Sequence, residues 1–241
     1  MILAAVHPVI PNFGGGSSAF ACERANRLFC PNWVSRNWGT VLWPALRQHI
    51  VLTVIAVAIG FVISMALALL AYRRGWLERP VMILTSILYT IPSLALFELL
   101  APATGLTRAT AEIALVSYTL LILFRNTLTG LREVPPEVRD AARGMGMGST
   151  QSLLRVELPL AAPAIIAGLR IATVTVISLA TVAALIDNEG LGVPILTAIS
   201  NEVFKTELIV AGAMAVALAL AADALLVLAQ RVITPWTRVG R

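Results

Sequence analysis

One polar stretch, Glu137 to Pro163, carries the most specific residue pattern in this chain. Its order is Asp140-Ala141-Ala142, three residues, Gly146, nine residues, Val156, one residue and Leu158-Pro159. Its Gly-Met-Gly-Met-Gly-Ser-Thr run has the small residues of a phosphate-binding loop. A P-loop, however, requires Gly-Lys-Ser/Thr after a strand, and this run has no lysine and follows a helical pattern. The sequence therefore predicts neither a nucleotide site nor a bound cofactor in this chain.

Local physics predicts two short helices in this segment, which we call the polar loop (135–163). Pro135 and Pro136 cannot continue an earlier helix, but proline suits a first turn, so a helix is expected from Pro136 to Arg143. Glycines then end it, because glycine accepts the positive φ that reverses a chain. A second helix, 151–158, is expected to be capped by Ser149 or Thr150 and closed by Pro159. An irregular loop that only links two spans is the alternative interpretation.

Composition places the rest of the chain in a membrane. Of 241 residues, 58% are hydrophobic and only 13% are charged, whereas soluble domains carry about a quarter charged residues. At 1.5 Å per residue, an apolar helix of about 20 residues crosses a bilayer core of about 30 Å. The sequence predicts an all-α integral membrane protein with five spans, near residues 49–72, 80–100, 109–124, 164–186 and 208–230.

The segments between these spans differ in character. Residues 1–48 are expected to form a loose tail and an interfacial segment anchored by Trp33, Trp38 and Trp43. Pro92 predicts a kink inside the second span. Residues 187–207 are too polar to cross a membrane and are expected to form an outer loop with a short lying or re-entrant helix. Residues 232–241 form a basic tail.

The arginines predict the orientation. Five spans put the chain ends on opposite faces, and cytoplasmic segments carry excess Lys and Arg. With the tail from Arg231 inside, inner segments hold 11 of the 18 basic residues and outer segments hold 6, with Arg170 inside a span. We therefore expect the N-terminus outside and the polar loop and C-terminus in the cytoplasm. No basic run is interleaved with aromatic residues, so nucleic acid is not an expected partner.

Cysteine and histidine residues are few. Cys22 and Cys30 both precede the first span and can close a small disulfide loop in an oxidising compartment. Two unpaired thiols are an equally open interpretation. His7 and His49 are isolated and receive no role. With two thiols and no histidine cluster, no metal site is predicted.

The polar loop resembles the EAA loop of ABC-importer permeases, whose pattern is Glu-Ala-Ala, three residues, Gly, nine residues, Ile, one residue, Leu-Pro. Asp140 and Val156 are conservative departures from that pattern. Further similarity, from about Trp43 to Trp236, is to permeases for osmoprotectants. The segments that show this similarity are Phe124-Arg125-Asn126-Thr127-Leu128-Thr129-Gly130-Leu131-Arg132, Ala167-Gly168-Leu169-Arg170, Ile91-Pro92-Ser93-Leu94 and Gly190-Leu191-Gly192.

This resemblance implies a fold, partners and a cargo. The fold is a type I ABC-importer permease bundle with a cytoplasmic coupling-helix loop. The partners are two cytoplasmic ABC ATPase subunits that hold ATP and Mg²⁺, an extracytoplasmic substrate-binding protein, and a second permease subunit, either the same chain or a paralogue. The chain itself would not be an enzyme. It would lie in a bacterial plasma membrane, surrounded by lipid, and pass a compatible solute such as glycine betaine or choline inward by alternating access.

Three other functions are alternatives. An ABC permease for another small polar solute, such as an amino acid, differs only in cargo. Secondary transporters normally show paired repeats or midplane ionisable groups for ion coupling. A membrane enzyme would need a catalytic motif, and none is visible.

The resemblance also implies which residues contact the ATPase. They are Glu137, Asp140, Ala141, Ala142, Gly144, Gly146, Val156, Leu158 and Pro159.

Polar residues inside spans usually face a bundle interior or a cavity, and they predict a substrate pathway. Its members are Tyr89, Thr90, Pro92, Ser93, Thr173, Ser178 and Thr181. For each serine or threonine, a hydrogen bond to a neighbouring helix or to its own helix is the competing explanation. Arg170 and Asp223 lie at similar depths in different spans and are expected to pair. The alternative is that Arg170 extends to the headgroups while Asp223 meets a backbone donor.

Overall fold

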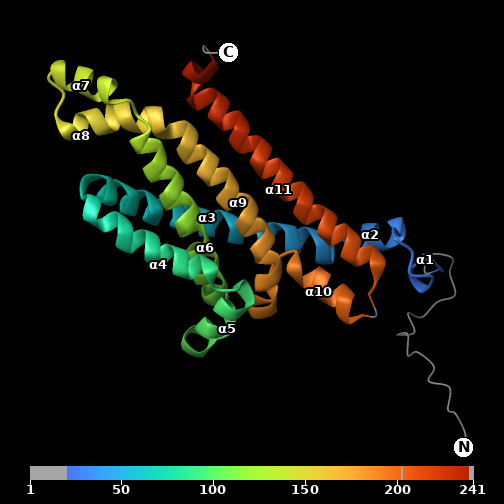
Figure 1. The fold of residues 1–241 in the computed structure, drawn as a ribbon. Helices are drawn as coiled ribbons and strands as arrows, with labels where there is room; N and C mark the ends of the chain where they lie inside the picture. The colour runs from blue at the N-terminus through green and yellow to red at the C-terminus, as the bar shows by residue number, and fades with distance from the viewer. Residues whose placement is uncertain (1–20, 202, 239–241) are drawn as a thin grey trace, which may run out of the picture.

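The computed structural model describes residues 21–201 and 203–238, and every regular element among them is a helix (Figure 1). The N-terminal half contains α1 (Ala21–Arg24), α2 (Pro31–Asn37), η2 (Trp38–Leu42), α3 (Trp43–Arg73), η3 (Gly75–Leu77), α4 (Glu78–Thr90), α5 (Ser93–Thr104) and α6 (Arg108–Arg132). The C-terminal half contains α7 (Pro136–Gly144), α8 (Ser149–Ser152), η4 (Leu153–Glu157), α9 (Leu158–Asp187), α10 (Gly192–Ser200), α11 (Lys205–Ile233) and η5 (Pro235–Arg238).

Within the described residues, four continuous helical stretches are long and apolar enough to cross a membrane, namely Pro31–Arg73, Arg108–Arg132, Ser149–Asp187 and Lys205–Ile233. A fifth crossing is possible only if α4 and α5 count together, and they are bent by 99° at their break. The single kinked helix expected over 80–100 is therefore two helices. Pro92 causes the break, because it lacks an N–H and restricts Ile91 to an extended conformation (φ −63°, ψ 128°). Tyr118 Oη donates to the Ile91 carbonyl at 2.5 Å.

Two π-helical turns lengthen the spans beyond their expected starts. η2 joins α2 to α3, so the helix begins at Pro31 and includes residues assigned to the loose tail. η4 joins α8 to α9, so the second helix of the polar loop runs on into the fourth span. The expectation that Pro159 closes this helix is wrong. Pro159 lies in the first turn of α9, directly after the wider π turn, where a missing N–H is tolerated.

Helix α6 lies at the centre and packs against α3, α4, α5 and α9. Its contact with α3 is close because α3 presents a stripe of small residues, Gly60, Ser64 and Ala68, all buried. A Cβ at Gly60 would lie 1.8 Å from Thr119 Oγ1 of α6, so only glycine fits there. Ser64 Oγ donates to the Leu120 carbonyl at 3.3 Å. This stripe therefore sets the distance between the two central helices.

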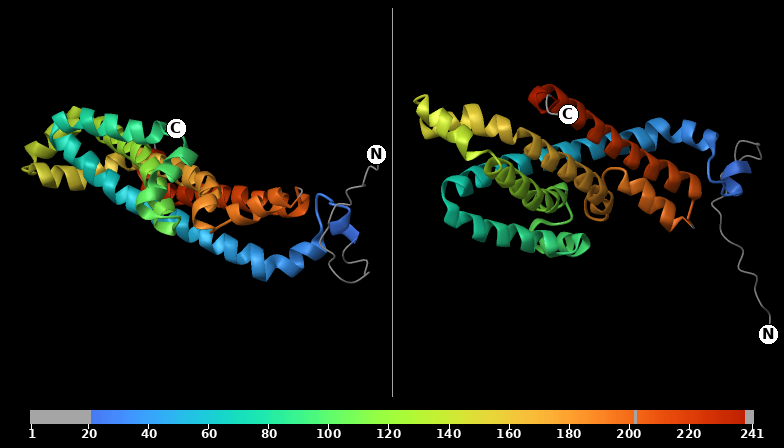
Figure 2. Two further views of the ribbon diagram at one scale, coloured as in Figure 1. Left: turned by 90° about the horizontal axis from the view of Figure 1, so that it is seen from below. Right: turned by 45° about the horizontal axis from the view of Figure 1, so that its top comes forward.

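The two ends of the bundle carry different elements. Helices α7 and α8 project at one end, together with the C-terminal end of α11 (Figures 1 and 2). Helices α1, α2 and α10 lie at the other end. Residues 1–20, with His7, lie outside the described part of the chain.

Candidate functional site

The turn of the polar loop depends on one glycine. Gly146 has φ +82°, which side chains rarely adopt, whereas Gly144 and Gly148 have ordinary φ values. Gly146 N donates to Arg143 O at 2.9 Å, and Met147 N donates to Ala142 O at 3.1 Å. These two bonds form a Schellman motif that ends α7 with glycine in the left-handed position. Gly148 is the N-cap of α8 and no side chain caps that helix, so the expected cap by Ser149 or Thr150 is wrong.

The predicted coupling residues form two groups. Those in and just after α7 are exposed, except for Ala142, which is buried. Met145, at the tip between them, is 70% exposed. The residues of the second group are half-buried where the loop enters α9. The exposed members are Glu137, Asp140, Ala141, Gly144 and Gly146, and the half-buried ones are Val156, Leu158 and Pro159. The first group therefore offers a surface, and the second fixes that surface to the bundle.

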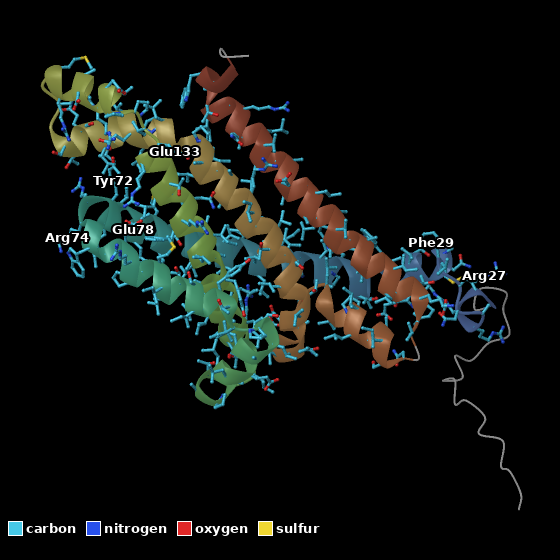
Figure 3. The ribbon with its side chains drawn as sticks, viewed as in Figure 1. Arg27, Phe29, Tyr72, Arg74, Glu78 and Glu133 are labelled. Atoms are coloured by element: carbon cyan, nitrogen blue, oxygen red, sulfur yellow. A yellow bond between two sulfur atoms is a disulfide. The ribbon has the colours of Figure 1, made fainter. Side chains whose placement is uncertain are left out.

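A hydrogen-bond network joins the polar loop to the end of α3. Tyr72 Oη donates to Glu157 Oε2 at 2.5 Å, and Ser152 Oγ donates to Glu157 Oε1 at 2.9 Å. Arg139 Nη1 donates to Tyr72 Oη at 3.3 Å. Figure 3 labels Tyr72 at the end of α3, next to the polar loop. The sequence offered one signal for this network, the acidic Glu157 between the apolar motif positions Val156 and Leu158, and it was missed.

Four predicted pathway residues meet at the break between α4 and α5. Thr90 and Ile91 line an open groove of about 500 Å³ along α4, with Met82, Ile83, Ser86 and Ile87. Tyr89 packs edge-on against Tyr118, with ring centroids 6.0 Å apart. Pro92 and Ser93 follow directly and begin α5. Thr90 Oγ1 donates to the Ser86 carbonyl of its own helix at 2.7 Å.

The three predicted pathway residues of α9 form a second set, for which the competing explanation has support. Thr173 Oγ1 donates to Leu169 O at 2.8 Å, and Thr181 Oγ1 donates to Ser178 O at 2.7 Å. Both acceptors belong to α9 itself. Ser178 is exposed. The groove along α4 is lined by none of these three residues.

Arg170 and Asp223 form a two-pronged ion pair between α9 and α11. Arg170 Nε donates to Asp223 Oδ1 at 2.7 Å, and Arg170 Nη2 donates to Asp223 Oδ2 at 2.9 Å. Both side chains are 34% exposed. Both charges lie within spans, where the lipid chains supply no polar partners. Each side chain therefore provides the counter-charge of the other.

We expect single neutralisation at this pair, by Arg170→Gln or Asp223→Asn, to lower the amount of permease recovered from membranes several-fold. The double variant Arg170→Asp with Asp223→Arg should restore most of it, because the attraction is rebuilt with the signs exchanged. Quantitative immunoblotting of membranes measures this amount. A double variant no more abundant than the single variants would contradict a stabilising role for the pair.

At the opposite end, a disulfide joins Cys22 to Cys30. The loop that it closes is tied to the start of α11. Asn26 Nδ2 donates to Val203 O at 3.1 Å, and Lys205 N donates to Asn26 Oδ1 at 2.9 Å. Figure 3 labels Arg27 and Phe29 in this loop. The disulfide therefore holds a short segment that anchors α11 at its N-terminal end.

His49, to which the sequence analysis gave no role, connects three elements. It is fully buried; its Nε2 lies 3.0 Å from the Ile177 carbonyl, and its Nδ1 accepts from Leu191 N at 3.2 Å. An accepting Nδ1 requires the neutral ring with the proton on Nε2. Next to it, a Cβ at Gly192 would lie 2.1 Å from the Thr181 carbonyl, so α10 can pack on α9 only with glycine there. His49 thus positions the Gly190-Leu191-Gly192 turn.

Three carboxylates, those of Glu112, Asp187 and Glu189, gather near the start of α6. Glu112 Oε1 lies 3.8 Å from Arg108 Nε, and Glu189 Oε2 lies 3.7 Å from Arg108 Nη1. Among the described residues, no group of three His, Cys, Asp or Glu side chains is placed to hold a metal ion.

Comparison with known proteins identifies the family of this chain. The family described as "Binding-protein-dependent transport system inner membrane component" matches residues 59–239. The chain belongs to this family. The osmoprotectant import permease protein OsmW of Salmonella typhimurium is 39% identical over 194 residues, 78% of this permease and 89% of that protein. The choline transport system permease protein OpuBB of Bacillus subtilis is 34% identical, over 84% of this permease and 93% of that protein.

Two further matches bear on this permease. One relative, the ergothioneine transport permease/ergothioneine binding protein EgtU of Helicobacter pylori, is 44% identical over 54% of the permease, but the match spans only 23% of that longer protein. A solved structure of the MetNI methionine ABC transporter, in an inward-facing conformation, superimposes with a TM-score of 0.67 at 20% identity. The match covers 83% of the permease and 96% of that chain. The permease therefore has the type I ABC-importer fold and is a multi-pass membrane protein.

Proposed function

We propose that this permease passes a compatible solute, such as glycine betaine or choline, across the bacterial plasma membrane. The observation that carries the proposal is the match over most of both chains to permeases named for osmoprotectants and for choline. The resemblance of Ile91-Pro92-Ser93-Leu94 to osmoprotectant permeases supports it, because this segment begins at Ile91, which lines the groove along α4.

The proposed partners follow from the family and the geometry. Two ATPase subunits, which bind ATP and Mg²⁺, would contact the exposed surface of α7. A substrate-binding protein would deliver the solute at the opposite end. The relative EgtU is named as both a transport permease and a binding protein. A second permease subunit, identical or related, would complete the membrane part.

We infer that the end bearing the polar loop is cytoplasmic and that the end bearing α1 and α10 is outside. The excess of arginine near the polar loop supports this orientation. A disulfide at the α1 end also fits, because disulfides persist in oxidising compartments.

In the mechanism that we propose, ATP binding closes the two ATPases, and the polar loops move with them. The spans then change between inward-open and outward-open arrangements. ATP and loaded binding protein shift this equilibrium only through their different affinities for the two states, so both are required. The groove along α4, with Tyr89, Thr90, Pro92 and Ser93 beside it, would form part of the solute pathway. A cage for a quaternary ammonium would belong to the binding protein.

Uptake into proteoliposomes tests this function. The vesicles contain the permease with its ATPase and binding-protein partners, and labelled glycine betaine, choline and amino acids are offered in turn. We expect uptake of glycine betaine or choline that requires internal ATP and the binding protein. Uptake of an amino acid, without uptake of glycine betaine or choline, would refute the proposed substrate. Uptake driven by an ion gradient without ATP would refute the ABC mechanism.

A further inference from the structure

The polar loop is tied to one span that it does not adjoin in the sequence. Helix α7 follows α6 directly, and α8 continues through η4 into α9, so displacement of the loop reaches these spans through the chain itself. Helix α3 has no such connection. Its links to the loop are noncovalent: Leu69 and other apolar residues of α3 pack against the cluster that holds Leu153, and the hydrogen bonds come from its last two residues, Tyr72 and Arg73. Movement of the loop therefore reaches α3 through this apolar packing, which is not directional, and through these hydrogen bonds, which are.

The Tyr72 junction, which consists of Tyr72, Arg139, Ser152 and Glu157, contains the more buried of these links. Glu157 is 7% exposed and Ser152 is 3% exposed. Both carboxylate oxygens of Glu157 accept a hydroxyl, one from α3 and one from α8. Such charge-assisted bonds are stronger than neutral ones, and a buried acceptor that loses its donor is costly. The second link, from Arg73 Nη2 to Thr150 Oγ1 at 3.0 Å, is exposed and should contribute less.

The ring and the hydroxyl of Tyr72 make different contacts at this junction. Its ring packs against a buried apolar cluster that includes Leu131, Leu153 and Ala161, from α6, η4 and α9. Its hydroxyl donates to Glu157 and accepts from Arg139 of α7, so one oxygen contacts both helical parts of the loop. Removing only the oxygen therefore removes the directional contacts and leaves the packing.

Glu157 is placed where the helix is locally distorted. It is the last residue of the π turn η4, at the start of α9. Single π turns inside α-helices occur frequently at functional sites. The carboxylate that accepts the Tyr72 hydroxyl thus lies where the loop joins a span.

We propose that Tyr72 is a positioning residue that makes the cytoplasmic end of α3 move with the polar loop, through Glu157 and Arg139. Closure of the ATPases would then reach the first span through a phenol hydroxyl. This inference rests on the proposed function, since it assigns a role in passing ATPase closure to the spans.

Tyr72→Phe tests the inference in the reconstituted complex. We expect normal assembly with the ATPase, retained ATP hydrolysis and about fivefold less solute transported per ATP, at the low end of coupling between sites. Ser152→Ala, which removes the other donor to Glu157, should change the same ratio in the same direction. Thr85→Val is the matched control, because its buried hydroxyl bonds only its own helix, and its ratio should stay at the wild-type value.

A double-mutant cycle separates this role from general stability. If Tyr72 acts through Glu157, Tyr72→Phe with Glu157→Gln should transport no less per ATP than the worse single variant. Additive losses, or an unchanged ratio in Tyr72→Phe, would overturn the role of Tyr72. Absence of ATP-driven uptake in the wild-type complex would instead overturn the proposed function itself.

Discussion

The Gly146→Leu variant should insert and assemble normally but lose most ATP-driven uptake. Gly146 has φ +82°, and nothing lies within 4 Å of the position that its Cβ would occupy. The cost is therefore one of backbone conformation, about 1–2 kcal/mol for a side chain in the left-handed region. That cost shifts a conformational equilibrium by about five- to thirtyfold and would move the loop away from the turn that orients α7. Uptake of labelled solute measures this loss. The stimulation of ATP hydrolysis by loaded binding protein should fall with it.

Another glycine of the same loop, Gly148, supplies a control for this variant. It lies outside the predicted coupling residues, and it has an ordinary φ value and open space at the Cβ position. Gly148→Ala should therefore retain stimulation close to the wild-type level. If Gly146→Leu were stimulated as strongly as Gly148→Ala, the turn would have no part in coupling.

We expect His49→Leu to destabilise the folded permease by about 1–3 kcal/mol, because Leu191 N loses its buried acceptor, whereas Ile177 O, in the middle of α9, keeps its helical hydrogen bond. The turn at Gly190-Leu191-Gly192 would lose its fixed position against α3. Thermal unfolding of the purified protein in detergent measures the change as a large fall in the midpoint temperature.

Thr53→Val, one helical turn further along α3, is the matched control. Thr53 is buried, and its hydroxyl has no hydrogen-bond partner. Replacing an unpaired hydroxyl by a methyl group of similar shape should be neutral or stabilising. Equal destabilisation by both variants would show that α3 tolerates no change there, and that the bonds of His49 are not the cause.

The sequence predicted those features that depend on residues close together in the chain. The turn at Gly146 follows from glycine between two helical segments, and the helix start at Pro136 follows from the Pro135-Pro136 pair. The depth argument for Arg170 and Asp223 used only their positions within spans, and the structure pairs them. Each inference needed only local geometry or the energetic cost of a charge in a bilayer.

Features that depend on distant partners or on small changes of helical bonding were not predicted. His49 meets Ile177 across 128 residues, and Tyr72 meets Glu157 across 85 residues, so no pattern near either residue indicates its partner. Pro159 was expected to end a helix because a π turn, which accommodates it, leaves no clear signal in residue types. The size of the bend at Pro92 depends on how α5 packs against α6 and α9.

Cross-linking from the tip of the polar loop tests whether this loop contacts an ATPase subunit. Met145 is exposed at that tip, and the two cysteines of the chain are bonded to each other, so Met145→Cys supplies one reactive thiol. A reagent with one thiol-reactive end and one photoreactive end is attached to this cysteine and irradiated in membranes that contain the whole transporter. We predict a cross-linked product that joins the permease to its ATPase, with a yield that changes when ATP is added. If the loop formed no product with any nucleotide-hydrolysing subunit, the polar loop would not be the contact between this permease and an ATPase.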